Sequence, residues 1–282
     1  MQFNLETAEI FIPDGKLIES GLARTTHLGI GAHQDDLEIM ALDGILDCFQ
    51  KDNQWFCGVV VTDGRGSPRK NLYEDYSDEE MRIIRIKEQK KAAVVGEYSA
   101  QIFLDYPSSS VKSNSNTKVI EDIARVIQAA SPEVVYTHNL ADKHDTHVAV
   151  SLRVIEAIQK LPEHQKPSTV YGCEVWRDLD WMVDSDKITF NVSSHENLQS
   201  ALLGVFDSQI AGGKRYDLAT MGRRRANATY FASHGTDIHT GIIFAMDLTP
   251  LVTETNMEIT DYLNGFLERF SNDITKRLAK FA

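Results

Sequence analysis

Cysteines, excess positive charge and long apolar runs are all scarce in this sequence, and each scarcity removes a class of protein. The chain of 282 residues has three cysteines, Cys48, Cys57 and Cys173, which lack CxxC spacing, so we expect a reducing compartment rather than a disulfide framework. The formal net charge of −12 argues against a nucleic-acid partner, which needs a basic surface. No stretch approaches the roughly 18 apolar residues that span a bilayer, and the first residues lack a secretory signal pattern. We therefore expect a cytoplasmic protein without membrane insertion.

The residues that are present have the composition of an ordinary globular enzyme. Hydrophobic residues make up 42% of the chain and charged residues 25%. No internal repeat, low-complexity segment or Pro/Ser-rich linker divides the sequence. We therefore expect a single domain over residues 1–282.

Short apolar runs alternate with helical stripes along the first two thirds of the chain. The expected strands are residues 26–32, 55–62, 101–105, 133–137, 169–176, 188–192 and 241–246. The expected helices are residues 37–49, 78–96 after a capping box at Ser77, 118–130, 148–161, 196–209 and about 261–281. This alternation predicts an α/β fold: a Rossmann-like, mostly parallel sheet with helices on both faces and irregular C-terminal additions.

Two polar clusters each follow directly after an expected strand. The first is residues 33–36 (HQDD), and the second is residues 138–147 (HNLADKHDTH). In open α/β sheets ligands bind outside the carboxyl ends of the strands, which lie at one edge. The two clusters are therefore expected to converge on one site.

The clusters contain the residue types of a catalytic zinc site. Such an ion takes about three N or O ligands and leaves a position open for water, and His33, Asp36 and His147 form such a set. Asp35 would then act as general base on water, and His144 would protonate the departing amine of an amide. The simpler interpretation is that an Asp-Asp pair caps a helix and that each histidine is structural. Spacing alone leaves both interpretations open.

The same clusters resemble the motifs of the PIG-L/LmbE-like N-acetylglucosaminylphosphatidylinositol deacetylase family. Residues 32–38 (AHQDDLE) are similar to its AHPDDxE motif, and residues 144–147 (HDTH) are similar to its HxDH motif. Further similar segments are residues 61–67 (VTDGRGS), 85–88 (RIKE) and 103–107 (FLDYP). The resemblance is strongest over residues 24–235.

The resemblance implies roles for six side chains. The zinc ligands would be His33, Asp36 and His147. Asp35 would be the base and His144 the acid. Arg65, in the TDG loop (residues 61–67), would contact the substrate. One Zn²⁺ per chain is implied, although Fe²⁺ and other divalent ions accept the same ligands.

The sequence departs from the family pattern at several positions. Gln34 replaces the usual Pro, which should leave the ligands intact but loosen the preset geometry of the turn. Thr146 replaces the Asp between the two histidines, so the partner of His144 is open, with Asp142 and Asp145 as the alternatives. Residues 108–110 are serines where relatives carry Asp-Gly. These differences lie where the family shapes its substrate pocket, so the chemistry is expected to carry over better than the substrate.

Three further groups of residues each have two interpretations. A cationic group would either hold an anionic substrate group or form a solvated helix face: Lys214, Arg215, Arg223, Arg224 and Arg225. A second group would either enter the site or lie outside it: His234 and His239. The tryptophans would either stack on a sugar ring or pack in the core: Trp55, Trp176 and Trp181.

The expected function is a zinc-dependent hydrolase that removes an N-acyl group, in the first instance acetyl, from a small amino-sugar-like molecule. The alternatives are an amidase for a larger acyl amide and a catalytically silent, metal-dependent sugar-binding protein. The presence of both Asp35 and His144 speaks against the silent binder, which needs no proton-transfer groups. A His/Asp metal phosphohydrolase would have a binuclear site in a helical bundle, contrary to the α/β pattern. The expected partner is a small-molecule N-acyl substrate, and the oligomeric state, including a homo-oligomer, is open.

Overall fold

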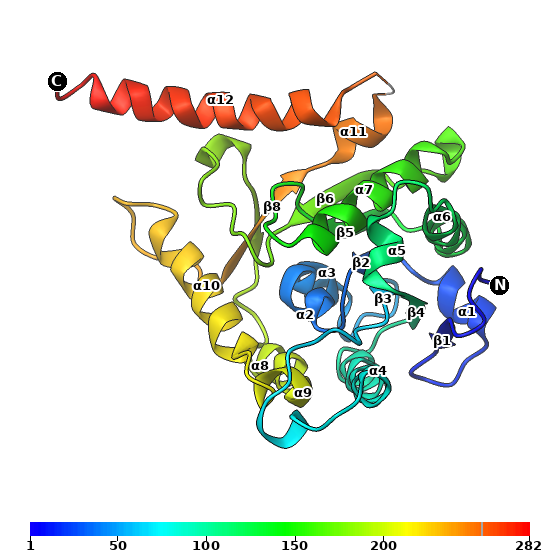
Figure 1. The fold of residues 1–282 in the computed structure, drawn as a ribbon. Coiled ribbons are helices and arrows are strands. Elements are labelled where there is room, and N and C mark those ends of the chain that lie inside the picture. Colours follow the sequence, from blue (N-terminus) through cyan, green and yellow to red (C-terminus); the bar gives the residue numbers. More distant parts are fainter. Residues whose placement is uncertain (255) are drawn as a thin grey trace.

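A computed structural model describes residues 1–254 and 256–282 and is built around one eight-stranded sheet. The strand order is β1-β4-β3-β2-β5-β6-β8-β7 (Figure 1). The strands are β1 Glu9–Phe11, β2 His27–Gly31, β3 Phe56–Thr62, β4 Ala100–Tyr106, β5 Val134–His138, β6 Thr169–Cys173, β7 Ile188–Asn191 and β8 Ile242–Asp247. Strands β4, β3, β2, β5 and β6 pair in parallel, whereas β1, β8 and β7 add antiparallel edges. The expected α/β, mostly parallel sheet is confirmed.

Helices cover both faces of the sheet. The α-helices are α1 Ile18–Ala23, α2 Asp36–Met40, α3 Leu42–Cys48, α4 Asp78–Val95, α5 Ser108–Lys112, α6 Lys118–Ala130, α7 Asp145–Gln159, α8 Glu196–Gly204, α9 Asp207–Ile210, α10 Tyr216–Tyr230, α11 Thr249–Thr253 and α12 Ile259–Leu278. Short 3-10 turns are Asn71–Tyr73, Glu163–Gln165 and Asp184–Asp186. Two buried apolar clusters lie on opposite faces: one joins the sheet to α6 and α7, and the other joins it to α2, α3, α4 and α8 (Figure 1).

The central strands are uniformly buried because helices cover them on both sides. Every residue of β2, β3 and β4 is buried, as expected for parallel strands between two helical layers. Helix α4 begins at the predicted capping box, in which the Ser77 hydroxyl accepts from the Glu80 amide and the Glu80 carboxylate accepts from the Ser77 amide. Among the helices of the described residues, none is both long and apolar enough to cross a membrane. The three cysteines are buried and free.

The helix expected over residues 37–49 is instead two helices, α2 and α3, that meet at Ala41. Within an unbroken helix, the carbonyls of Glu38 and Ile39 would accept hydrogen bonds from the amides four residues ahead. Here the Arg224 guanidinium occupies them, donating to the Glu38 carbonyl at 2.7 Å and the Ile39 carbonyl at 3.3 Å. A distant arginine therefore divides this helix, which the local sequence does not show.

The helix expected over residues 196–209 is also divided. Helix α8 ends at Gly204, and α9 begins at Asp207 after the buried side chain of Phe206. The Ser208 amide donates to the Glu88 carboxylate at 2.7 Å rather than to a carbonyl of α8. The interaction with α4 thus directs the chain away from the helix axis. Helix α10 and the short elements β1, α1, α5 and α11 were not predicted, whereas the terminal helix lies close to its predicted place.

Candidate active site

The candidate site lies where the direction of strand order reverses. The chain runs outward from β2 through β3 to β4 and then returns to place β5 on the other side of β2. Such a switch point leaves a crevice outside the carboxyl ends of the two diverging strands. His33 follows β2 and His147 lies in the first turn of α7, shortly after β5. The two predicted clusters therefore meet at the position that this topology favours for a ligand.

The three predicted metal ligands present their donor atoms to one point. His33 Nδ1 lies 3.2 Å from His147 Nε2 and 3.3 Å from Asp36 Oδ2. His147 Nε2 lies 3.4 Å from the other carboxylate oxygen, Asp36 Oδ1. Ligands about 2.1 Å from a zinc ion at tetrahedral angles lie about 3.4 Å apart. The separations between the three side chains thus match the spacing of ligands around one zinc ion.

The protonation of these groups also suits a cation. Burial lowers the pKa values of His33 and His147, so both imidazoles are neutral and have a lone pair to offer. Asp36 Oδ2 accepts a hydrogen bond of 2.6 Å from the His33 amide, which favours the ionised carboxylate. His147 Nδ1 faces Asp142 Oδ2 at 3.4 Å, which leaves Nε2 as the unprotonated nitrogen.

His138 is close to the same point but is engaged elsewhere. Its Nε2 lies 3.4 Å from Asp36 Oδ2, and with His147 these side chains form one of two possible metal-binding groups; the other is His33, His144 and His147. However, His138 Nε2 accepts a hydrogen bond of 2.9 Å from the Ala32 amide, so its lone pair is already used. Its ring stacks on that of His147 with centroids 3.9 Å apart. His138 therefore supports the ligand His147 rather than adding a fourth.

Asp35 lies beside the ligands in a constrained backbone conformation. Its φ of 88° is in the left-handed region, which turns its side chain away from Asp36 and into the cavity. Its Oδ2 is buried without a hydrogen-bond partner, 3.6 Å from Arg85 Nη2. Burial raises the pKa of Asp35 well above its usual range, although the Arg85 guanidinium opposes the rise. A carboxylate of this kind is suited to accept a proton from water.

Helix α4 holds the turn that carries these residues. Arg85 donates to the Gln34 carbonyl at 2.6 Å, and Gln89 Oε1 accepts from the Asp35 amide at 3.2 Å. Gly64 of the TDG loop approaches so closely that an added Cβ would meet Gln34 Oε1 at 2.3 Å. Helix α4 and this loop therefore hold from outside the turn that a proline would otherwise preset.

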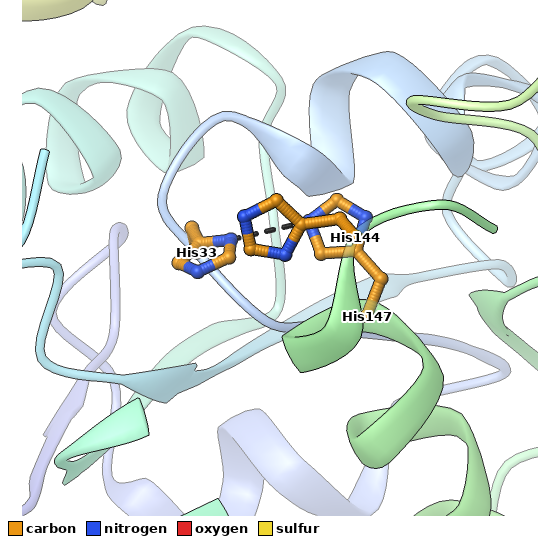
Figure 2. A group of neighbouring side chains, drawn as sticks. All are labelled: His33, His144 and His147. Carbon is orange, nitrogen blue, oxygen red and sulfur yellow. Dashed lines mark hydrogen bonds between the residues drawn. The ribbon is translucent and has the colours of Figure 1, made fainter. Parts of the chain in front are cut away.

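His144 faces His33 and His147, and Figure 2 shows the three rings gathered between the loop after β2 and the start of α7. Burial, His147 and His33 together lower the pKa of His144 to about 4, so its ring is neutral near pH 7. Its Nδ1 is buried without a hydrogen-bond partner. Neither expected carboxylate contacts the ring: Asp142 accepts from the His144 backbone amide at 2.9 Å, and Asp145 is exposed. Asp142 instead orients His147.

A cavity of about 460 Å³ opens above the ligands. Its walls come from the TDG loop, α5, α7, the segment after β6 and the α9–α10 connection. Lining residues to which the sequence analysis gave no role include Ser67, Arg85, Lys112, Gln209 and Tyr216. Ser67 lies in a loop and the others lie in α4, α5, α9 and α10. Only Ser67 and Arg85 had a signal, since they belong to the family-like segments 61–67 and 85–88. Their positions depend on the tertiary fold.

Arg65 does not line this cavity, although its neighbours Gly64 and Gly66 do. Its guanidinium pairs with Asp63 at 3.1 Å and with Glu79 at 2.6 Å. A contact with substrate would require Arg65 to leave both carboxylates, so this role stays a prediction.

The remaining candidates divide between the site and the scaffold. Lys214 and Trp176 line the cavity. Arg224 is buried and holds α2, contrary to both of its interpretations, whereas Arg215 and Arg225 are exposed. Residues away from the cavity lining are Trp55, Trp181, His234 and His239. Of these, Trp181 packs against the core.

Comparison with known proteins finds one matching family model and several solved structures with a similar fold. Residues 28–158 match the family model described as PIG-L: GlcNAc-PI de-N-acetylase. No curated protein sequence matches the chain closely enough to be counted as a relative.

Three solved structures share the fold at low sequence identity. The 4-carboxy-2-hydroxymuconate hydratase GalB of Pseudomonas putida is 18% identical, over 83% of this chain and 99% of that one, with a TM-score of 0.61. The N,N'-diacetylchitobiose deacetylase of Pyrococcus horikoshii is 17% identical, over 89% and 93%, with a TM-score of 0.61. A conserved protein of Thermus thermophilus is 15% identical, over 82% and 98%, with a TM-score of 0.57.

Proposed function

We propose that this chain is a metal-dependent hydrolase of the PIG-L/LmbE-like deacetylase type, which removes an N-acyl group, in the first instance acetyl, from a small amino-sugar-like molecule. The match of residues 28–158 to the PIG-L family model supports the proposal. The observation that carries the proposal is that donor atoms of His33, Asp36 and His147 lie 3.2 to 3.4 Å apart, beside a cavity that His33, Asp36 and Asp35 line. A chelating group of side chains beside a carboxylate oxygen without a hydrogen-bond partner is the minimum that amide hydrolysis requires.

The proposed ion is zinc, one per chain, held by those three side chains. When bound, it would supply a Lewis acid that polarises water and the amide carbonyl and stabilises the developing oxyanion. The same donor set accepts Fe²⁺ and other divalent ions. The neutral histidines and the ionised Asp36 support a cation of this class.

Asp35 is proposed to take the proton from the attacking water. Its Oδ2 has no hydrogen-bond donor in the free protein, and its raised pKa makes it a stronger base than an exposed aspartate. Arg85 limits the position of the carboxylate from the other side. The proton that Asp35 gains is then available within the cavity for the departing amine.

His144 is proposed to deliver a proton to that amine. With a pKa of about 4, it is neutral in the free protein and becomes a donor only after it gains a proton. The negative charge that develops on the reacting carbonyl oxygen would favour that protonation. A direct transfer from Asp35 to the amine is the alternative, and the two are distinguished by the effect of His144→Gln on the pH dependence of kcat.

The test measures metal content and amine release by the purified, zinc-reconstituted protein. N-acetylglucosamine, its neutral and charged derivatives, and amides with longer acyl groups form the substrate panel. Asp35→Asn should lower kcat by about 10²- to 10⁴-fold with metal content unchanged. Asp52→Asn is the control, since Asp52 is exposed and outside the cavity lining.

Three results would overturn parts of this proposal. Failure to bind metal after reconstitution contradicts the metal site. Metal binding with no cleavage of any amide contradicts the hydrolase and favours a silent sugar-binding protein. Preferential cleavage of longer acyl groups contradicts the acetyl specificity and favours the amidase.

A further inference from the structure

We propose that the active-site cavity continues into an outer chamber that binds an anionic group, phosphate or carboxylate, on the part of the substrate away from the cleaved amide. This proposal rests on the proposed function for the identity of the amide, but not for the binding of the anion. A second cavity of about 270 Å³ adjoins the first, and the two share the walls formed by Ile39, Val175, Trp176 and Tyr216. The shared walls make them two chambers of one cleft.

The outer chamber is cationic in an acidic protein. The chain has 41 acidic and 29 basic residues. Even so, the charged residues that line this chamber, among those the structure describes, are Lys143 and Arg223, with no carboxylate. Lys214 lines the inner cavity and lies over Trp176, with its Nζ 4.9 Å from the ring centroid. Three cations thus surround the boundary between the chambers.

Burial raises the pKa of Glu174 and the Arg223 guanidinium opposes the rise, so this carboxylate is near one of the cations, but it has other partners. Glu174 is buried, and its Oε1 accepts from Asn227 at 2.6 Å and from the Phe244 amide at 3.2 Å. The carboxylates of the inner cavity, Asp35 and Asp36, belong to the proposed catalytic floor. Within the described part of the chain, neither Lys143 nor Lys214 forms an ion pair with a carboxylate. Both ammonium groups therefore remain free for a ligand.

Arg223 and Trp176 give the chamber a fixed shape. Arg223 Nη1 donates to the Val175 carbonyl, so its guanidinium is anchored at the wall, and its other nitrogens form no hydrogen bond with the residues that the structure describes. Trp176 stacks on His144 with centroids 6.0 Å apart and meets Tyr216 edge-on at 6.2 Å. A sugar or other ring that packs on half-buried Trp176 would therefore extend from His144 toward the cations. The geometry points to a substrate of two parts, with its N-acyl group at the metal site and its anionic group in the outer chamber.

The test compares the binding of matched ligands to the zinc-loaded Asp35→Asn protein by calorimetry. The ligands are the neutral methyl glycoside of N-acetylglucosamine, its glycosyl phosphate and N-acetylmuramic acid, which carries a carboxylate. We expect at least one anionic ligand to bind more tightly than the glycoside, and added salt to reduce that preference. Lys143→Met and Lys214→Met should each reduce the anion-to-neutral affinity ratio about tenfold, the size of one charge-assisted contact. Lys276→Met on exposed α12 is the control.

The outcomes separate this proposal from the proposed function. A ratio near one in the parent protein, or a ratio that the two lysine variants leave unchanged, overturns the anionic chamber. The preference for phosphate over carboxylate, or the reverse, identifies the group. If the ratio falls as expected but the wild-type protein cleaves none of the ligands, the chamber is supported and the hydrolase is contradicted.

Discussion

Asp142 provides the sharpest test of how the metal ligand His147 is oriented. Its Oδ2 faces His147 Nδ1 at 3.4 Å and accepts from the Trp176 amide at 3.1 Å, while its Oδ1 accepts from the His144 amide at 2.9 Å. Asp142→Asn keeps the shape of the side chain but replaces one carboxylate oxygen, a hydrogen-bond acceptor, with an NH₂ group, which donates. An NH₂ directed at His147 would move the ring proton to Nε2 and remove the lone pair that faces the metal site. In the opposite orientation of the new side-chain amide, its NH₂ group would face the His144 backbone amide, so two donors would meet.

The expected loss follows from that geometry. Replacing the carboxylate that orients a metal-bound histidine costs about 10- to 100-fold in metal affinity, or about 1.4 to 2.7 kcal/mol. Zinc affinity would be measured by competition with a chromophoric chelator, and circular dichroism would show that the fold persists. Asp145→Asn is the matched control because Asp145 lies in the same segment but is exposed. An Asp142→Asn protein that is folded and binds zinc as tightly as the parent would refute the orienting role.

Two further predictions concern stability. Burial raises the pKa of Asp43 to about 6 while the Tyr136 hydroxyl donates to it at 3.0 Å. Its ionisation therefore costs the folded state stability as pH rises through about 6. In thermal melts at about pH 8, Asp43→Asn should raise Tm by the equivalent of about 1 to 2 kcal/mol, whereas at about pH 4 it should leave Tm unchanged. Equal shifts in Tm at the two pH values would contradict this reasoning. Gly64→Ala should lower the free energy of unfolding by about 1 to 2 kcal/mol in urea titrations, because φ of Gly64 is +69° and an added Cβ would meet Gln34. Gly66→Ala is the control: an added Cβ there has open space, so the free energy of unfolding should fall less.

The convergence of the three proposed metal ligands was predictable because local sequence fixes most of their geometry. His33 and Asp36 lie on one turn, where the Asp36 carboxylate also accepts from the His33 amide at 2.6 Å. His147 could be placed because alternation of strands and helices brings the end of β5 beside that of β2. Mostly apolar strands and one strong capping box sufficed to establish this order. The sheet and the floor of the site therefore follow from short-range patterns.

The cavity walls were not predictable for the opposite reason. Arg224 appeared to belong to a cationic surface run, yet it is buried and divides α2 from α3 at a sequence separation of 186 residues from Glu38. Glu88 likewise sets the start of α9 from 120 residues away. No local periodicity records such contacts, since each depends on which segments the finished fold brings together. Tyr216 and Lys214 reach the cavity through the same long-range arrangement.

The two departures from the family motifs have unequal consequences. Gln34 is compensated, since Arg85 and Gln89 of α4 hold the turn that a proline would have preset. Thr146 is not compensated at the acid, because His144 Nδ1 has no carboxylate partner and its pKa is low. A histidine without such a partner holds a proton poorly in the free protein. Proton delivery to the amine should thus depend more on Asp35 than the motif alone implies, and kcat should fall less in His144→Gln than in Asp35→Asn.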